Sequence, residues 1–125
     1  MTSDQIRLDF PARGEYGRIA RTAAAALARR LGFDAEATGQ ICLAVDEAVI
    51  LLLKTRGEMG TVRVVFEPSS EFLVIELSHM GDADASVDRE TVARFRAIAT
   101  QTVDDFDVNE QRCRIRLAKA RPVPF

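Results

Sequence analysis

The sequence predicts an α+β fold, a two-layer α/β sandwich in which helices cover one face of a mostly antiparallel sheet. Five short segments are rich in β-forming residues or alternate apolar and polar side chains, which is typical of strands. Three longer segments repeat apolar residues at three- and four-residue steps, which is typical of helices with one buried stripe. The order β-α-α-β-β-α-β-β joins most strands by hairpins, and the single stripe on each helix places all helices on one face.

Local patterns locate the strands. Strands are expected at residues 6–10, 61–67, 72–78, 103–108 and 112–119. Pro11 ends the first strand, and the turn residues Pro68-Ser-Ser-Glu join the second and third in a hairpin. The last two strands form a second hairpin. In the final strand the two sides differ, with Cys113, Ile115 and Leu117 on one and Arg112, Arg114 and Arg116 on the other.

Helices are expected at about residues 14–31, at 35–54, and from Ser86 or Asp88 to about Thr100. Gly32 is suited to ending the first helix, and Asp34 is suited to capping the second, because its side chain accepts from free amides of the first turn. Gly57 and Gly60 break the second helix, and a small, acidic loop precedes the third. The predicted buried stripes are Ile19, Ala23, Ala26 and Leu27; then Ile41, Val45, Ala48 and Leu52; then Val92, Phe95 and Ile98.

Length and charge limit the classes of protein. The chain has 125 residues, enough for one domain, which we expect to span residues 1–125. A net charge of -2 gives no basic surplus, so direct nucleic-acid binding is not expected. No apolar run approaches the roughly 20 residues that cross a membrane. The N-terminal Met-Thr-Ser-Asp-Gln lacks the features of a signal peptide, so we expect a cytoplasmic protein without membrane partners.

The cysteines and the single histidine predict no metal site. Cys42 and Cys113 lie far apart within apolar patterns, so we expect two small buried side chains and no disulfide in a reducing cytoplasm. Neither cysteine has a second thiol nearby, and His79 is the only histidine. A zinc site of the usual ligand spacing therefore cannot be built.

Several segments carry a resemblance to a known family. They are Leu43-Ala-Val-Asp-Glu-Ala in the second helix, Leu8-Asp-Phe-Pro-Ala before the first, and Val103-Asp-Asp-Phe-Asp-Val followed by Arg114-Ile-Arg-Leu-Ala-Lys. With the element order, they make nearly the whole chain resemble the anti-sigma factor serine kinases of the histidine-kinase-like ATPase superfamily. The resemblance implies a homodimer that silences an alternative sigma factor. It also implies phosphorylation of an anti-anti-sigma partner on serine with ATP and magnesium.

The second helix departs from the family pattern in its chemistry. The resemblance gives Glu47 the role of general base. In this chain Glu47 is either a vestigial base or simply a solvated or paired helix carboxylate. Four residues on, where the family has a magnesium-binding Asn, stands Leu51, which offers no oxygen to a hard cation. Thr55 stands where the family often has His. We expect Leu51 to be buried and to fill the former nucleotide cavity.

The family's two glycine motifs are also altered. His79 stands where the family has an Asp that accepts the adenine amino group, Gly81 is retained, and Ala83 replaces the second glycine. The phosphate-binding Gly-x-Gly corresponds to positions near Ala93 and Phe95, and no glycine follows Gly81. His79 and Gly81 are thus vestigial cofactor positions with strand-end and turn roles. We expect no cofactor, with ATP and magnesium bound only if the altered site still works.

A basic stripe on the first helix is the candidate partner surface. Arg18, Arg21, Ala25 and Arg29 follow three- and four-residue steps and share a face. This face is either simply solvated or recognises a partner. The resemblance places Arg21 at the sigma-factor and anti-anti-sigma contact, and arginine forms bidentate pairs with acidic surfaces. We therefore assign Arg18 and Arg21 to partner binding.

Three functions compete. The leading hypothesis is a regulatory protein-binding domain, an anti-sigma factor that has lost or weakened ATP binding. One alternative is an active ATP-dependent serine kinase, which would need another metal ligand because Asp46 lies off the Glu47 face. Another is a non-catalytic scaffold unrelated to transcription. For oligomeric state, the alternatives are a homodimer or a monomer whose edge is protected by the strand with Arg112 to Arg116.

Overall fold

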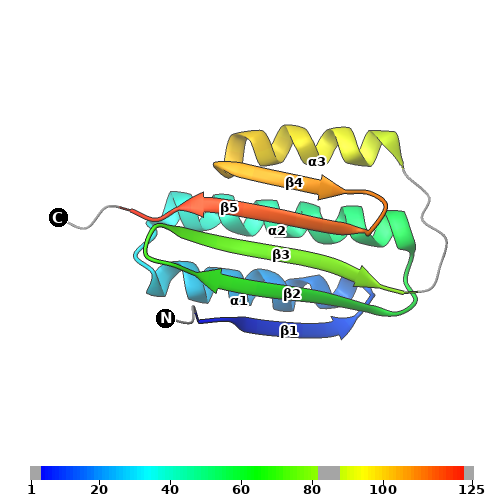
Figure 1. Cartoon of the computed structure of the whole chain (residues 1–125), viewed down its shortest axis with the longest axis horizontal. Coiled ribbons are helices and arrows are strands. Elements are labelled where there is room, and N and C mark those ends of the chain that lie inside the picture. The colour runs from blue at the N-terminus through cyan, green and yellow to red at the C-terminus, as the bar shows by residue number, and fades with distance from the viewer. Residues whose placement is uncertain (1–3, 82–87, 123–125) are drawn as a thin grey trace.

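The computed structural model describes residues 4–81 and 88–122 and has the predicted two layers (Figure 1). In chain order the elements are β1 (Ile6–Pro11), the 3-10 helix η1 (Gly14–Tyr16), α1 (Gly17–Arg30), α2 (Ala35–Arg56), β2 (Thr61–Pro68), β3 (Phe72–Met80), α3 (Arg89–Thr102), β4 (Asp105–Asn109) and β5 (Arg114–Ala120). The strands form one antiparallel sheet in the order β1-β2-β3-β5-β4. The predicted α+β class is confirmed.

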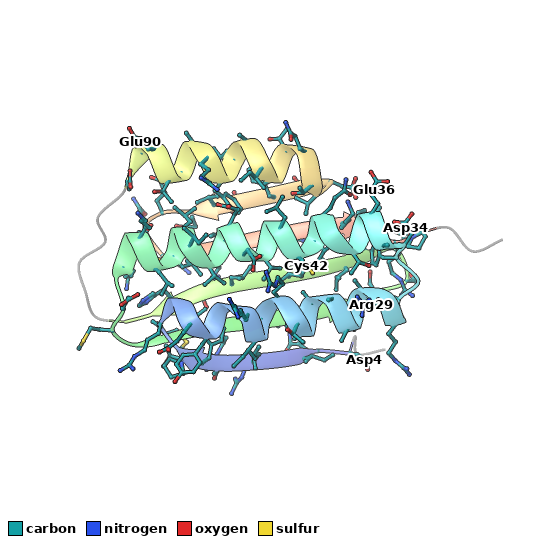
Figure 2. All side chains as sticks on the ribbon, turned by 180° about the vertical axis from the view of Figure 1, so that it is seen from behind. Asp4, Arg29, Asp34, Glu36, Cys42 and Glu90 are labelled. Carbon is teal, nitrogen blue, oxygen red and sulfur yellow. The ribbon has the colours of Figure 1, made fainter. Side chains whose placement is uncertain are left out.

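Side-chain alternation decides which face of the sheet is buried. Every second residue of β2 and β3 is buried, and the register sets Val64 opposite Leu77 and Phe66 opposite Ile75. Leu117 of β5 extends this row beside Ile75. The helices lie behind the sheet in Figure 1 and in front of it in Figure 2, with α2 between α1 and α3. The core therefore fills the space between one sheet face and three helices.

The central helix α2 begins and ends where its sequence predicts, within two residues. Oδ1 of Asp34 accepts a hydrogen bond from the Ala37 amide at 2.8 Å, which confirms the predicted cap. The helix ends at Arg56 because Gly57 has a left-handed φ of 86°. Its predicted buried stripe is confirmed at Ile41, Val45, Ala48 and Leu52. No helix in the described ranges is long and apolar enough to cross a membrane.

The predicted buried face of α1 is half right: Ala23 and Leu27 pack half-buried against the core, but Ile19 and Ala26 do not. Ile19 is 46% exposed and Ala26 is also exposed, whereas the buried residues are Ala20, Ala24 and Ala28. These alanines follow four-residue steps on one side of the helix. Their short side chains let α1 approach the core closely, while Ile19 remains on the outer side.

Several element boundaries differ from the prediction. β3 continues to Met80, two residues beyond the predicted end, so His79 is the next-to-last residue of the strand, as its predicted strand-end role implies. The final strand begins at Arg114, and buried Cys113 lies in the preceding turn with a φ of 50°. In α3, Ile98 is only half-buried, and the inward positions are Val92, Phe95, Ala99 and Thr102.

The second face of the sheet carries rows of opposite charges. Glu76 of β3 lies opposite Arg116 of β5, which lies opposite Asp107 of β4. On β1 and β2, Arg63 Nε donates to Asp9 Oδ1 at 2.9 Å. Because β5 lies between β3 and β4, its arginines do not protect an edge, and that expectation is wrong. The edge strands are β1 and β4.

Candidate functional site

Glu47 lies where α2 faces α3, and an arginine occupies its carboxylate. The residue is 5% exposed. Arg94 of α3 donates to it twice, from Nε to Oε2 at 3.2 Å and from Nη2 to Oε1 at 3.1 Å. This bidentate pair compensates a buried charge that would otherwise be strongly unfavourable. The paired-carboxylate interpretation of Glu47 fits this geometry, which leaves neither oxygen free of a cationic partner.

One turn further along α2, hydrocarbon fills the position that the family uses for a metal ligand. Leu51 is 3% exposed, which confirms the prediction that it is buried. The cavity beside it, lined in part by Val92 and Ile115, measures about 10 Å³, which is room for one water at most. The Thr55 hydroxyl donates to the Leu51 carbonyl oxygen at 2.7 Å and is satisfied within its own helix. On this part of α2, Leu51 offers no oxygen to a magnesium ion, and the Thr55 hydroxyl is already engaged.

His79 is buried and anchored to the main chain through one ring nitrogen, while its Nδ1 has no hydrogen-bond partner among the described residues. It is 3% exposed, and its Nε2 donates to the Gly57 carbonyl oxygen at 2.8 Å. A Cβ added at Gly81 would lie 2.9 Å from Cε1 of the His79 ring, so the close packing at this position requires a glycine. Arg56 Nη1 donates to the Gly81 carbonyl oxygen at 2.5 Å. Ala83, the altered second glycine, lies outside the described residues.

The first turn of α3 carries its own anion. Oδ1 of Asp88 accepts from the Glu90 amide at 3.1 Å, and Oδ2 accepts from the Thr91 hydroxyl at 2.8 Å. The hydrogen bond from Thr91 lowers the pKa of Asp88. A helix start normally attracts phosphate, but a carboxylate already uses these donors. Ala93 and Phe95, near the expected phosphate loop, lie inside α3, and Phe95 is fully buried.

Arg18 and Arg21 lie on α1, apart from the pair formed by Glu47. Arg21 Nη1 lies 3.3 Å from Asp46 Oδ2, on the side of α2 that faces α1. Burial raises the pKa of Asp46, and the Arg21 guanidinium opposes that rise. Cys42 is half-buried, contrary to the prediction, and its thiol lies 3.7 Å from the Arg21 carbonyl oxygen. Asp46 is therefore turned away from Glu47 and cannot complete a metal site with it.

Fold and site together define an α/β-sandwich domain whose candidate site lies between the central helix and α3. The sequence profile of the histidine kinase-like ATPase domain matches residues 10–108. That range contains all three helices and every site residue described above except Ile115 of β5. The chain therefore belongs to the histidine kinase-like ATPase domain family. A search of curated proteins finds no significant match to the chain.

Arg94, which makes the principal contact to Glu47, is not among the site residues predicted from the sequence. The two residues are 47 positions apart, so no local pattern joins them. The side chain of Arg94 is also 68% exposed, which makes it resemble any solvated helix arginine. The usable signal lay in Glu47 itself. A carboxylate among the apolar positions of α2 needs a cationic partner, and the facing helix is the place to seek one.

Proposed function

We propose that this chain is a regulatory protein-binding domain, an anti-sigma factor that sequesters an alternative sigma factor and has lost or weakened ATP binding. The observation that carries the proposal is the closed state of the site: Arg94 holds both oxygens of Glu47, and Leu51 fills the metal-ligand position. A domain of an ATPase family whose nucleotide site is filled in this way can still act by binding another protein on its outer surface. The sigma factor as partner rests on the resemblance of the chain to anti-sigma factor serine kinases.

The loss of nucleotide binding is tested by calorimetry with ATP and magnesium. We expect no saturable binding at physiological ATP concentration. Each missing charge-assisted contact weakens binding by roughly 1.5–3 kcal/mol, and the metal, adenine and phosphate contacts are all altered. A dissociation constant in the low micromolar range would contradict the proposal. Transfer of phosphate to a serine of an anti-anti-sigma protein would establish the kinase alternative in its place.

The partner is tested by a pull-down with purified alternative sigma factors of the source organism. Arg18→Glu and Arg21→Glu should each abolish binding, because a favourable pair becomes a repulsive one. Arg89→Glu, on α3, is the matched control and should retain binding. Circular dichroism of each variant checks that the fold is intact. If Arg18→Glu and Arg21→Glu bind like the parent, the basic stripe is a solvated face and the partner surface lies elsewhere.

A further inference from the structure

Two large apolar side chains stand exposed on the outer side of the central helix. Leu43 is 44% exposed and Ile50 is 42% exposed, although α2 buries most of its other apolar residues. Seven residues separate them, which is close to two helical turns, so both point to the same side. Exposed aliphatic side chains repeated at this spacing on one helix are typical of surfaces that receive another helix.

The helix that packs beside α2, α1, carries a basic ridge formed by its arginines. The helix α1 has four arginines and no acidic residue. The three helices together carry nine basic and four acidic side chains, although the whole chain has a net charge of -2. Within the described residues, no ion pair involves Arg18 or Arg29. The positive charge of the helix layer is therefore local and largely uncompensated on α1.

Contacts between α1 and α2 place the arginine-bearing helix beside the helix that carries Leu43 and Ile50. Toward α3, Ile50 also lines a surface pocket with the charged side chains of Asp88, Glu90 and Arg94. The Arg21–Asp46 pair and the Cys42 thiol against the Arg21 carbonyl oxygen fix the two helices side by side. Figure 2 shows this outer side, with Arg29 on α1 and Cys42 on α2. Gly39 adds to the access, because a Cβ placed there would meet no atom within 4 Å.

We propose that this outer helix face, formed by Arg18, Arg21 and Arg29 of α1 with Leu43 and Ile50 of α2, docks an acidic amphipathic helix of a protein partner. The aliphatic side of the partner helix lies against Leu43 and Ile50, and its carboxylates meet the arginines. Asp46 competes with those carboxylates for Arg21. This inference rests on the proposed function only in that the chain acts by binding a protein, and it names the chemistry of the segment that is bound.

The test uses the full chain and two fluorescent peptides, helices with leucine on one side and either glutamate or lysine on the other. Anisotropy should show binding of the glutamate peptide and not of the lysine peptide. Leu43→Ser and Ile50→Ser should each weaken binding about tenfold. Ile6→Ser is the matched control, since Ile6 is 47% exposed but lies on β1. Asp46→Asn should strengthen binding severalfold by releasing Arg21, a gain that misfolding cannot produce.

The outcomes separate this inference from the proposed function. Equal binding of both peptides, binding of neither, or an Ile50→Ser variant that behaves like Ile6→Ser overturns the acidic-helix surface. Binding to phosphatidylglycerol vesicles in place of the glutamate peptide also overturns it. If the sigma factor is not bound but the peptide pattern holds, the sigma-factor assignment fails and this surface stands. If the sigma factor is bound equally by the parent and by Ile50→Ser, the surface is overturned and the assignment stands.

Discussion

At Leu51, a buried hydrocarbon side chain stands at the position that the family resemblance assigns to a metal ligand. Its position on α2 points into the core, where about 10 Å³ of cavity remains. An amide at this position would need hydrogen-bond partners in an apolar surrounding, and the hydroxyl of Thr55, one turn further along, already donates to the Leu51 carbonyl oxygen. Restoring the family residue would therefore not restore the family chemistry.

We predict that Leu51→Asn destabilises the fold by roughly 1–3 kcal/mol, because an amide is placed in an apolar site. The variant should still show no saturable ATP binding, since the other altered positions remain. Urea denaturation measures the change in unfolding free energy. Leu43→Asn is the matched control on the same helix, where the side chain is 44% exposed, and it should have a much smaller effect. Equal midpoints for the two variants would contradict the prediction.

Between elements, the Glu47–Arg94 pair joins α3 to the central helix. Arg94→Ala leaves a carboxylate that is 5% exposed without its partner. We predict a loss of roughly 1–3 kcal/mol in unfolding free energy. Arg96→Ala, on the same helix and exposed, is the control and should change little. Combining Arg94→Ala with Glu47→Gln should recover part of the loss, because the unpaired charge is removed. Equal stability of the Arg94→Ala and Arg96→Ala variants would exclude a structural role for the pair.

Element types were predictable from the sequence because most periodic patterns are unambiguous. In α2, Ile41, Val45 and Ala48 define one stripe, and the Asp34 cap gives its start. In α1 the apolar stripe is ambiguous, because two overlapping sets of residues have helical spacing. The set containing Ile19 is larger in volume, but the alanine set is buried. Side-chain volume alone could not decide this, since close approach of α1 favours the smaller residues.

For the whole molecule, the candidate site could be predicted only for residues that are close to one another in the sequence. The positions of Glu47 and Leu51 on one helix follow from their four-residue spacing, and the burial of Leu51 is confirmed. The partner of Glu47 comes from α3, and that contact depends on how the helices pack on the sheet. The half-burial of Cys42 likewise depends on the distance between α1 and α2. The Glu47–Arg94 contact and the burial of Cys42 are therefore both determined by how the helices pack, which the local sequence pattern does not specify.

We predict that the chain forms a homodimer, as the family resemblance implies. The edge strands β1 and β4 present unpaired backbone groups that favour further strand pairing. The acidic side chains of β4, Asp105 and Asp107, oppose pairing of that edge with a copy of itself, so β1 is the better candidate. Light scattering at micromolar concentration should give twice the chain mass of 13.8 kDa. A mass equal to one chain would refute the dimer.

The strand order has a consequence for how the chain folds. The β2–β3 hairpin closes over residues 69–71 alone, whereas β1 reaches β2 only after the 49 residues that contain α1 and α2. Closing a long loop costs more chain entropy than closing a short one, and contacts between residues distant in sequence form more slowly. We therefore expect β1 to join the sheet late. By the same reasoning, β1 should also open first in the native state. Its amides are then expected to exchange hydrogen with solvent ahead of those in β2 and β3.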